Sequence, residues 1–534
     1  MTAASRADFF GPGRSPLVAR DAAVATSHPL ATGAALEILL AGGNAVDAAI
    51  AATAVHAVVE PQMTGIGGDC FVLYAPKDRP TVALNGSGRA PAAATVERLR
   101  AAGLDGSIPR TSPHAVTIPG AVSAWTRLHA DHGRLPLDRL FVRAIDYAEN
   151  GYPVAPRVAF DWAMEAEILA RNADAAALFL PGGRPPRAGD RHSQPLLAER
   201  LRAIGRDGAA AFYEGETTAS MVRYLRGRGG LHTLEDFFEG KDAAHYTTPI
   251  SIDYRGLTIE ECPPNGQGLA ALMMLSILKE FDLGEGLTAA DRIHVHAEAA
   301  KLVYHHRDTL IGDPAAMTTR IEDLLSPETA RRLAARIDPA RALPPALWTE
   351  PEHRDTVYLC VVDRDGNMVS FINSIFETFG STLLDPATGV LMHNRGSSFR
   401  LLDGHPNAIG PRKRPMHTII PALMRRDGVA CGVFGVMGGH YQAAGHAALV
   451  SGLVDRGLGL QAAVDAPRSF SFNGVLELEP TIPDAVAAEL AARGHVVRRP
   501  DEPLGSAQAI LVDRERGCLV AASDPRRDGC ALGY

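Results

Sequence analysis

The chain has 534 residues, of which 46% are hydrophobic and 21% charged, and a formal net charge of −8 from 53 basic and 61 acidic residues. This composition is typical of a globular protein with a buried core, and the lack of a basic stripe argues against nucleic-acid binding. No apolar stretch is long enough to span a bilayer and no secretory signal is apparent, so the sequence predicts a soluble, cytoplasmic protein without membrane contact.

The pattern of apolar residues, glycines and prolines predicts an alternation of helices and strands along the chain. The first twenty residues form a mixed arm, and six scattered cysteines without a CxxC pair argue against a disulfide framework or a zinc ribbon. The elements expected after the arm are helices at 30–40 and 45–59, a glycine-rich loop at 64–69, a strand at 70–74, and helices separated by polar loops over 115–335, including one at 289–307.

Residues from about 336 to 355 carry several prolines and no periodic pattern, which is typical of a linker. The chain then becomes richer in strands. Expected there are a buried strand at 356–362, a returning strand at 368–376, a strand at 430–437 and a helix at 441–454. Strands that alternate with helices indicate an α/β protein.

A tight turn between the first two of these strands allows their register to be predicted. If Arg364-Asp365-Gly366 forms a three-residue loop with Gly366 in the left-handed region, Asp363 pairs with Asn367. Counting back along the two strands then places Thr356 opposite Ser374. A slip of one residue would break this pairing.

The helix at 289–307 carries several histidines and raises the possibility of a metal-dependent hydrolase. His294, Glu298 and His305 share one face of that helix. There is no HExxH motif, and Lys301 on the same face would repel a cation. We therefore interpret this face as a solvated or capped helix surface and expect neither a metal nor another cofactor.

Six motifs in order resemble the gamma-glutamyltransferase family, from about residue 22 to the C-terminus. The first is Ile38-Leu39 with Gly42-Gly43-Asn44-Ala45-Val46-Asp47, followed by Gly65-Ile66-Gly67-Gly68. The run Asp355-Thr356-Val357-Tyr358 to Asp363-Arg364-Asp365-Gly366-Asn367 is similar to the family's processing site. The remaining motifs are Gly410-Pro411-Arg412-Lys413-Arg414-Pro415, Met437-Gly438-Gly439 and Ala522-Ser523-Asp524-Pro525-Arg526.

The resemblance implies a four-layer αββα fold of the N-terminal-nucleophile hydrolases. It also implies one precursor cut between Asp355 and Thr356 into a segment 1–355, with the linker at its end, and a segment 356–534 that stay associated. Thr356 would be the nucleophile and its freed amine the base, Ser374 would hold that amine, and Gly438 and Gly439 would form the oxyanion hole. A free α-amine titrates at about 7.7–8.0, so it can accept a proton at neutral pH, which a peptide nitrogen cannot.

The substrate pocket implied by the resemblance departs from the members that cleave glutathione. Those members use an Arg for the glutamyl carboxylate, where this chain has Ser87, with Arg89 two residues later as a possible substitute. The trio that holds the α-amino group, an Asn, a Gln and an Asp, corresponds here to Phe376, Arg395 and Ser398. The paired serines that complete the pocket correspond to residues 417 and 418, which are His417 and Thr418.

An arginine in that trio would repel an α-ammonium and bind a carboxylate through two hydrogen bonds. We therefore expect a hydrolase of a small acyl amide that bears a carboxylate, of the oxamate or glutaryl type. The alternatives are a glutathione hydrolase or transferase, in which Arg395 neutralises a nearby acid, and an unprocessed binding protein without catalysis. The expected partners are the small-molecule amide and the other fragment of the same precursor, with further dimerisation possible.

Overall fold

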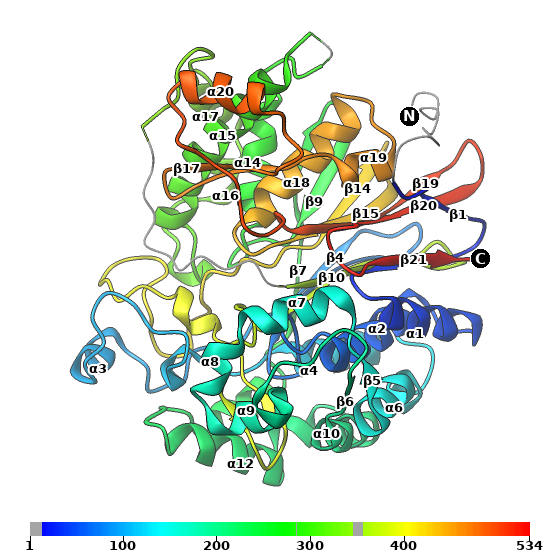
Figure 1. Ribbon diagram of the computed structural model, residues 1–534, viewed down its shortest axis with the longest axis vertical. Helices are drawn as coiled ribbons and strands as arrows, with labels where there is room; N and C mark the ends of the chain where they lie inside the picture. The colour runs from blue at the N-terminus through cyan, green and yellow to red at the C-terminus, as the bar shows by residue number, and fades with distance from the viewer. Residues whose placement is uncertain (1–12, 285, 345–355) are drawn as a thin grey trace.

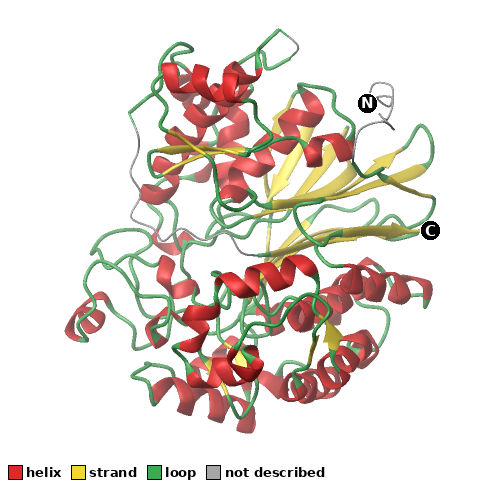
Figure 2. Cartoon of the chain, in the orientation of Figure 1, coloured by secondary structure: helices red, strands yellow, loops and turns green. Residues whose placement is uncertain are grey.

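The computed structural model describes residues 13–284, 286–344 and 356–534, and within them it has four layers. Two seven-stranded antiparallel sheets lie face to face in the middle of the molecule, and helices cover the outer face of each (Figure 1). Figure 2 shows the two sheets nearly edge-on between the helical layers. This arrangement is the predicted αββα sandwich.

The two sheets are each assembled from distant parts of the chain. The first has, in spatial order, β1 (Leu17–Ala19), β20 (Cys518–Ser523), β19 (Ser506–Asp513), β15 (Val429–Met437), β14 (Ala422–Arg426), β9 (Leu257–Glu261) and β8 (Ile250–Tyr254). The second has β21 (Cys530–Gly533), β2 (Ala23–Thr26), β10 (Val357–Val362), β11 (Met368–Ser374), β3 (Asp69–Ala75), β4 (Val82–Gly86) and β7 (His245–Thr247). Both sheets therefore contain strands from either side of Thr356.

Strand β10 has the sequence expected of a strand that is buried on both faces. All six of its residues are buried. Tyr358, Cys360 and Val362 pack into the core between the two sheets, whereas Leu359 and Val361 pack against the helices on the other face. A continuous apolar run is the pattern expected for a strand covered on both sides.

Helices of the two outer layers come from different regions of the sequence. The layer over the second sheet includes α1 (Pro29–Leu40), α2 (Ala45–Val59), α4 (Ala121–His132), α6 (Val142–Asn150) and α10 (Pro195–Asp207). The layer over the first sheet includes α14 (Gly268–Leu278), α15 (Ala289–Leu310), α17 (Pro327–Ala334), α18 (Tyr441–Val454), α19 (Leu460–Asp465) and α20 (Asp484–Ala492). A three-stranded sheet of β16 (Ser469–Phe472), β17 (Val475–Leu478) and β18 (Val497–Arg498) lies beside α15.

The helices predicted near the N-terminus are confirmed, including the cap of the second one. The Asn44 side chain accepts from the Asp47 amide, and the Asp47 carboxylate accepts from the Asn44 amide, which forms a capping box. Every residue of α2 is buried, and its many alanines let this helix pack closely against its neighbours. The prediction of an arm over the first twenty residues is partly wrong, because Leu17–Ala19 forms a strand that pairs with β20. Residues 1–12 lie outside the described part of the chain.

The predicted β10–β11 hairpin is confirmed at the level of register. Asp363 N donates to Asn367 O at 3.1 Å, and Gly366 has a φ of +85°. The ladder pairs Val357 with Asn373, so the next position places Thr356 beside Ser374. In residues 13–284, 286–344 and 356–534, no helix is long and apolar enough to cross a membrane.

Candidate active site

Thr356 lies at the start of β10, and its hydroxyl is held by two side chains. Thr356 is fully buried, and its Oγ1 donates to Ser374 Oγ at 3.4 Å. Gln442 Nε2, from the first turn of α18, donates to the same oxygen at 3.2 Å. Asp355, the predicted residue on the other side of the cleavage site, lies outside the described residues. The hydroxyl of Thr356 is thus fixed between a strand and a helix.

Ser374 also determines where its strand ends. Its Oγ accepts from Phe376 N at 2.9 Å, and Phe376 has a φ of +81°, which is uncommon for a residue with a side chain. The strand therefore stops at Ser374, and the predicted extension to Phe376 is wrong by two residues. This turn aims the chain after the strand toward Arg395.

Two of the predicted substrate-binding residues, Phe376 and Thr418, contact the guanidinium of Arg395, which is a third. This side chain is 1% exposed, and its Cζ lies 4.0 Å from the centroid of the Phe376 ring. Arg395 Nη1 donates to Thr418 Oγ1 at 2.9 Å. Ser398 lies in the same short 3₁₀ turn, Arg395–Ser398, and its hydroxyl lies 3.0 Å from Arg395 O and 2.9 Å from Met416 O. A chain of contacts therefore runs from Thr356 through Ser374 and Phe376 to a buried cation.

His417 takes a supporting position beside this group. Its Nε2 lies 3.0 Å from Asp69 Oδ2, and its backbone N–H donates to Asn265 O at 2.8 Å. Burial, with a further contribution from the charge of Arg395, lowers the pKa of His417 to about 3, so its ring is neutral at pH 7. The nitrogen facing Asp69 then carries the proton and donates to the carboxylate.

Asp69 is a buried carboxylate that the sequence did not single out. Its Oδ1 accepts from Gly88 N at 2.9 Å and from Gly120 N at 3.2 Å, while Oδ2 faces His417 and, at 3.4 Å, His393 Nδ1. Despite burial, the two histidines hold the pKa of this carboxyl well below its usual range. Asp69 closes the glycine-rich loop, but its partners are too distant in sequence to be predicted.

Ser87 and Arg89 are engaged elsewhere. Ser87 Oγ accepts from Asn265 Nδ2 at 2.9 Å, and Arg414 Nε donates to Ser87 O at 3.0 Å. Arg89 Nη1 donates to Arg412 O at 2.8 Å. Within the described part of the chain, Arg89 forms no hydrogen bond with Thr356 or Arg395. The structure therefore does not bring Arg89 into the group around Arg395.

The two candidate oxyanion glycines connect β15 to α18 in conformations that require glycine. Gly438 has a φ of +120° and Gly439 a φ of +57°. A Cβ on Gly438 would lie 2.8 Å from the Cα of Gly505. Among the described residues, neither amide N–H donates to a protein acceptor, so both remain available for a ligand. Two adjacent free N–H groups at a helix start suit a developing negative charge.

Two glutamines that sequence reasoning missed join this turn to the rest of the site. Gln267 Nε2 donates to Gly439 O at 2.9 Å and to Thr418 O at 2.7 Å. Gln442 uses its amide nitrogen on Thr356 and its oxygen to accept from Ile420 N at 3.1 Å. No motif marks either residue, because glutamine is common on helices.

The interpretation of the α15 histidines as a solvated face is wrong. His294 and Glu298 are fully buried, while His305 is exposed and lies outside their cluster. The third member is His495, whose Nε2 lies 2.8 Å from His294 Nδ1 and 3.8 Å from Glu298 Oε1. The three donor atoms lie within 4.8 Å of one another, as metal ligands do. Lys301 Nζ nevertheless donates to Glu298 Oε1 at 2.6 Å, so a cation already balances that carboxylate.

The same cluster holds the described part of the linker. His294 Nε2 donates to Asp338 O at 2.8 Å, and Leu343 N donates to Glu298 Oε2 at 2.7 Å. Lys301 Nζ donates to Leu343 O at 3.0 Å. A buried side-chain cluster thus fixes the chain just before the segment that leads to Thr356, whereas linker residues 345–355 lie outside the described residues.

Comparison with known proteins identifies relatives over the whole length of the chain. The model of the gamma-glutamyltranspeptidase family matches residues 31–534. A glutathione hydrolase-like proenzyme of Bacillus subtilis is 36% identical over 96% of this chain and 98% of its own length. The oxamate amidohydrolase proenzyme of Klebsiella pneumoniae is also 36% identical, over 95% and 97%. The crystal structure of a cephalosporin acylase from Bacillus halodurans has a TM-score of 0.92 at 38% identity and covers 100% of this chain and 99% of that one.

Proposed function

This chain belongs to the gamma-glutamyltranspeptidase family and is an amide-hydrolysing enzyme of it; from that premise we propose that Thr356 is the nucleophile and is freed by self-cleavage. The observation that supports this most directly is the position of the Thr356 hydroxyl, buried at a strand start between Ser374 Oγ and Gln442 Nε2. The relatives in Bacillus subtilis and Klebsiella pneumoniae are both named as proenzymes, which supports a precursor that is cut.

Self-cleavage begins with attack of Thr356 Oγ on the carbonyl carbon of Asp355. The C–O bond forms, the C–N bond before Thr356 breaks, and the nitrogen takes up a proton to become the α-amine. The resulting ester is opened by water, which leaves a carboxylate on Asp355 and returns the hydroxyl to Thr356. The products are a fragment 1–355 and a fragment 356–534 that remain associated.

The freed amine then serves as the general base of the amide hydrolysis. It accepts the hydroxyl proton as Thr356 Oγ attacks the substrate carbonyl, and it returns that proton to the leaving amine. The products of this half-reaction are an acyl ester on Thr356 and a free amine. Water then attacks the ester carbonyl while the amine accepts a proton from it. The amine passes that proton to Thr356 Oγ, which leaves, so the acid product and the free hydroxyl are released. Ser374 Oγ is positioned to hold the amine near the hydroxyl.

The turn at Gly438 and Gly439 supplies the stabilisation of negative charge in each tetrahedral intermediate. The two glycines directly precede α18. Gln442, in the first turn of that helix, contacts Thr356 through its side chain. Because both glycines have positive φ, the turn cannot be rebuilt with other residues without strain. Removing one donor of such a pair typically lowers the rate by about 10²–10³.

We further propose that the substrate is a small acyl amide that carries a carboxylate at its acyl end. Arg395 is buried within the chain of contacts that leads from Thr356, and a guanidinium binds a carboxylate through two parallel hydrogen bonds. An ammonium placed there would be repelled. The names of the relatives that act on oxamate and on cephalosporins agree with such a substrate.

A direct comparison of two substrates tests this proposal. Purified protein is incubated with glutaryl-p-nitroanilide and with γ-glutamyl-p-nitroanilide, which differ only in the α-amino group. Faster turnover of the glutaryl compound supports the proposal, and faster turnover of the γ-glutamyl compound assigns the chain to the glutathione hydrolases instead. A denaturing gel of the same sample separates both from a non-catalytic binder, which would run as one full-length band.

A further inference from the structure

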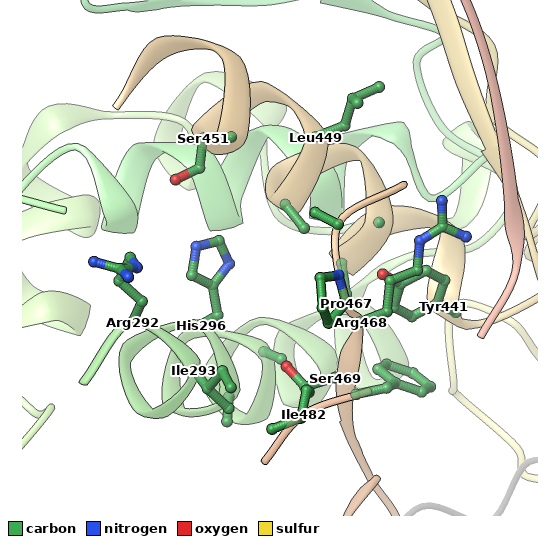
Figure 3. Close-up of a pocket in the computed structure, with 18 of the residues that line it drawn as sticks. Arg292, Ile293, His296, Tyr441, Leu449, Ser451, Pro467, Arg468, Ser469 and Ile482 are labelled. Atoms are coloured by element: carbon green, nitrogen blue, oxygen red, sulfur yellow. The ribbon is translucent and has the colours of Figure 1, made fainter. Parts of the chain in front are cut away.

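A cavity lies in the helical layer over the first sheet, apart from the site of Thr356. It has a volume of about 230 Å³ and is enclosed by α15, α18, α19 and β16. Thr356, Arg395, Gly438 and Gly439 are not among the residues that line it. Figure 3 shows its two ends, with Arg292 and His296 at one and Tyr441 with Arg468 at the other.

The body of this cavity is apolar. Its walls include Ile293, Leu449, Phe470 and Ile482 together with several alanines. Cavities of about 150 Å³ with such walls bind benzene, so this one has room for an alkyl chain of roughly six to eight carbons. Arg468, which also lines the inner end, is already neutralised by Asp524 at 2.5 Å.

The outer end of the cavity carries positive charge, and none of the described residues that line it is a carboxylate. Arg292 and Arg456 both line it, and the partners of Arg292 Nη1 within the described ranges are the backbone carbonyls of Gly284 and Leu287. Among the described residues, the guanidinium of Arg456 forms no hydrogen bond or ion pair, whereas its backbone N–H donates to Ser451 O at 3.3 Å. Burial lowers the pKa of Arg456, and the charge of Arg292 lowers it further, because two cations share this end.

The acid beside Arg456 in the sequence is occupied by other groups. Asp455 Oδ1 accepts from Arg255 Nε at 2.7 Å, and its Oδ2 accepts from Tyr254 OH and Ser451 Oγ, each at 2.6 Å. His296 stands between the arginines and the apolar body, and burial lowers its pKa to about 4, so it is neutral at pH 7. It can therefore donate one hydrogen bond to an anion.

From this arrangement we propose that the cavity between α15 and α18 is an accessory binding site for a medium-chain monocarboxylate. The carboxylate lies between Arg292, Arg456 and His296, and the alkyl chain extends along the apolar walls toward Tyr441. This site goes beyond the proposed hydrolysis and does not depend on it. An anion there offsets the repulsion between two guanidinium groups, and the chain gains from burial of apolar surface.

The test is calorimetric binding of octanoate to the full protein, with octylamine as a probe of the same length and opposite charge. We expect octanoate to bind at millimolar concentration or below and octylamine not to bind. The double substitution Arg292→Gln and Arg456→Gln is expected to weaken octanoate binding at least about tenfold. A double substitution of the exposed pair Arg331→Gln and Arg332→Gln removes the same net charge elsewhere and should leave binding unchanged.

Two further variants keep the test decisive. Ala448 lines the cavity with an exposed side chain, so Ala448→Leu fills it without altering any charge and should abolish binding even if the arginine variant fails to fold. Arg395→Gln removes the cation near Thr356 and should leave octanoate binding intact. The proposal is overturned if octanoate does not bind, if Ala448→Leu binds it normally, if octylamine binds equally well, or if Arg395→Gln removes the binding.

Discussion

The guanidinium of Arg395 lies 4.0 Å from the ring centroid of Phe376, which is two residues after Ser374 at the end of β11. The ring covers one face of the guanidinium and leaves its edge, where the N–H groups point, for polar partners such as Thr418 Oγ1. A planar fork held by an aromatic face is well suited to recognise a carboxylate. The first prediction follows from this pair.

Arg395→Gln is expected to lower kcat/KM for glutaryl-p-nitroanilide by about 10- to 100-fold, the loss typical of a hydrogen bond to a charged group. Arg395→Lys keeps the charge but cannot donate two parallel hydrogen bonds to a carboxylate. Its kcat/KM should therefore lie between those of the wild type and Arg395→Gln. Activity toward an acyl amide without a carboxylate, such as butyryl-p-nitroanilide, serves as the control and should change little. Equal losses for both compounds would show that Arg395 maintains the fold instead of binding substrate.

Thr356→Ala is expected to leave the chain uncut and inactive, because it removes the hydroxyl that attacks Asp355. Thr356→Ser keeps a hydroxyl at the same position and should retain some processing. The measurement is a time course on denaturing gels, with N-terminal sequencing of the smaller fragment. The wild type is expected to give a fragment that begins Thr-Val-Tyr, and a fragment that begins Ala-Val-Tyr from Thr356→Ala would refute this mechanism.

Gly438→Ala is expected to lower kcat by about 10²–10³, as loss of an oxyanion donor does. The added Cβ would lie 2.8 Å from the Cα of Gly505, and a φ of +120° is strained for any residue with a side chain. The turn must therefore move, and its N–H groups move with it. Gly457→Ala, at a φ of +61° with no atom near its Cβ, is a control for backbone strain away from the site and should keep its kcat.

Glu298→Gln is expected to slow self-cleavage while leaving the turnover of the matured fraction unchanged. Glu298 holds both Leu343 N and Lys301 Nζ, so it fixes the linker ahead of the bond that is cut. Loosening that anchor enlarges the set of conformations that the linker must search. The half-time of processing is compared with that of Glu489→Gln, which removes a carboxylate from the exposed ion pair with Arg493. Equal half-times would argue against a role for the anchor.

Acid is expected to destabilise the fold as pH falls from about 6.5 toward 4. Burial is the main cause that lowers the pKa of six histidines to about 3 or 4, namely His28, His192, His232, His296, His417 and His495. In this pH range the unfolded chain binds protons that the folded chain does not, so unfolding becomes easier as pH falls, by up to about 1.4 kcal/mol per pH unit for each group. Glu60 acts in the opposite sense, because burial raises its pKa to about 7.

The uncut Thr356→Ala chain is the suitable sample for this measurement, since it remains one molecule. Its urea midpoint is expected to be lower at about pH 5 than at about pH 7, and to change little from about pH 7.5 to 8.5, where these histidines are neutral in both states. His417→Gln should reduce the dependence of the urea midpoint on pH, because it removes one of these six histidines. A midpoint that rises on acidification would contradict this account.

Local chemistry explains which parts of this architecture could be predicted from the sequence. The hairpin register followed from one turn, because Gly366 in the left-handed region fixes the pairing of Asp363 with Asn367 and so brings Thr356 to Ser374. Helix α18 was predicted with the bounds Tyr441–Val454 because two glycines precede it. These features depend on residues close together in the chain.

The misses depend on contacts between distant segments. Helical periodicity placed His294 and Glu298 on one face, but it could not show that His495 and the linker cover that face. The contact of Asp69 with His417 spans 348 residues and leaves no local signal. The same limit applies to Gln442 in α18, whose partner Thr356 is 86 residues away in the chain.

The interleaving of strands in both sheets affects how the proposed two-fragment enzyme refolds after denaturation. Strand β10 lies between β2, which precedes Thr356 in the chain, and β11, which follows it. Once the bond before Thr356 is open, complete unfolding is also a dissociation into two polypeptides. Renaturation then becomes a second-order encounter that slows on dilution, whereas the uncut chain folds at a rate independent of its concentration. The proposed cleavage therefore leaves a sandwich whose two polypeptides must find each other again before it can refold.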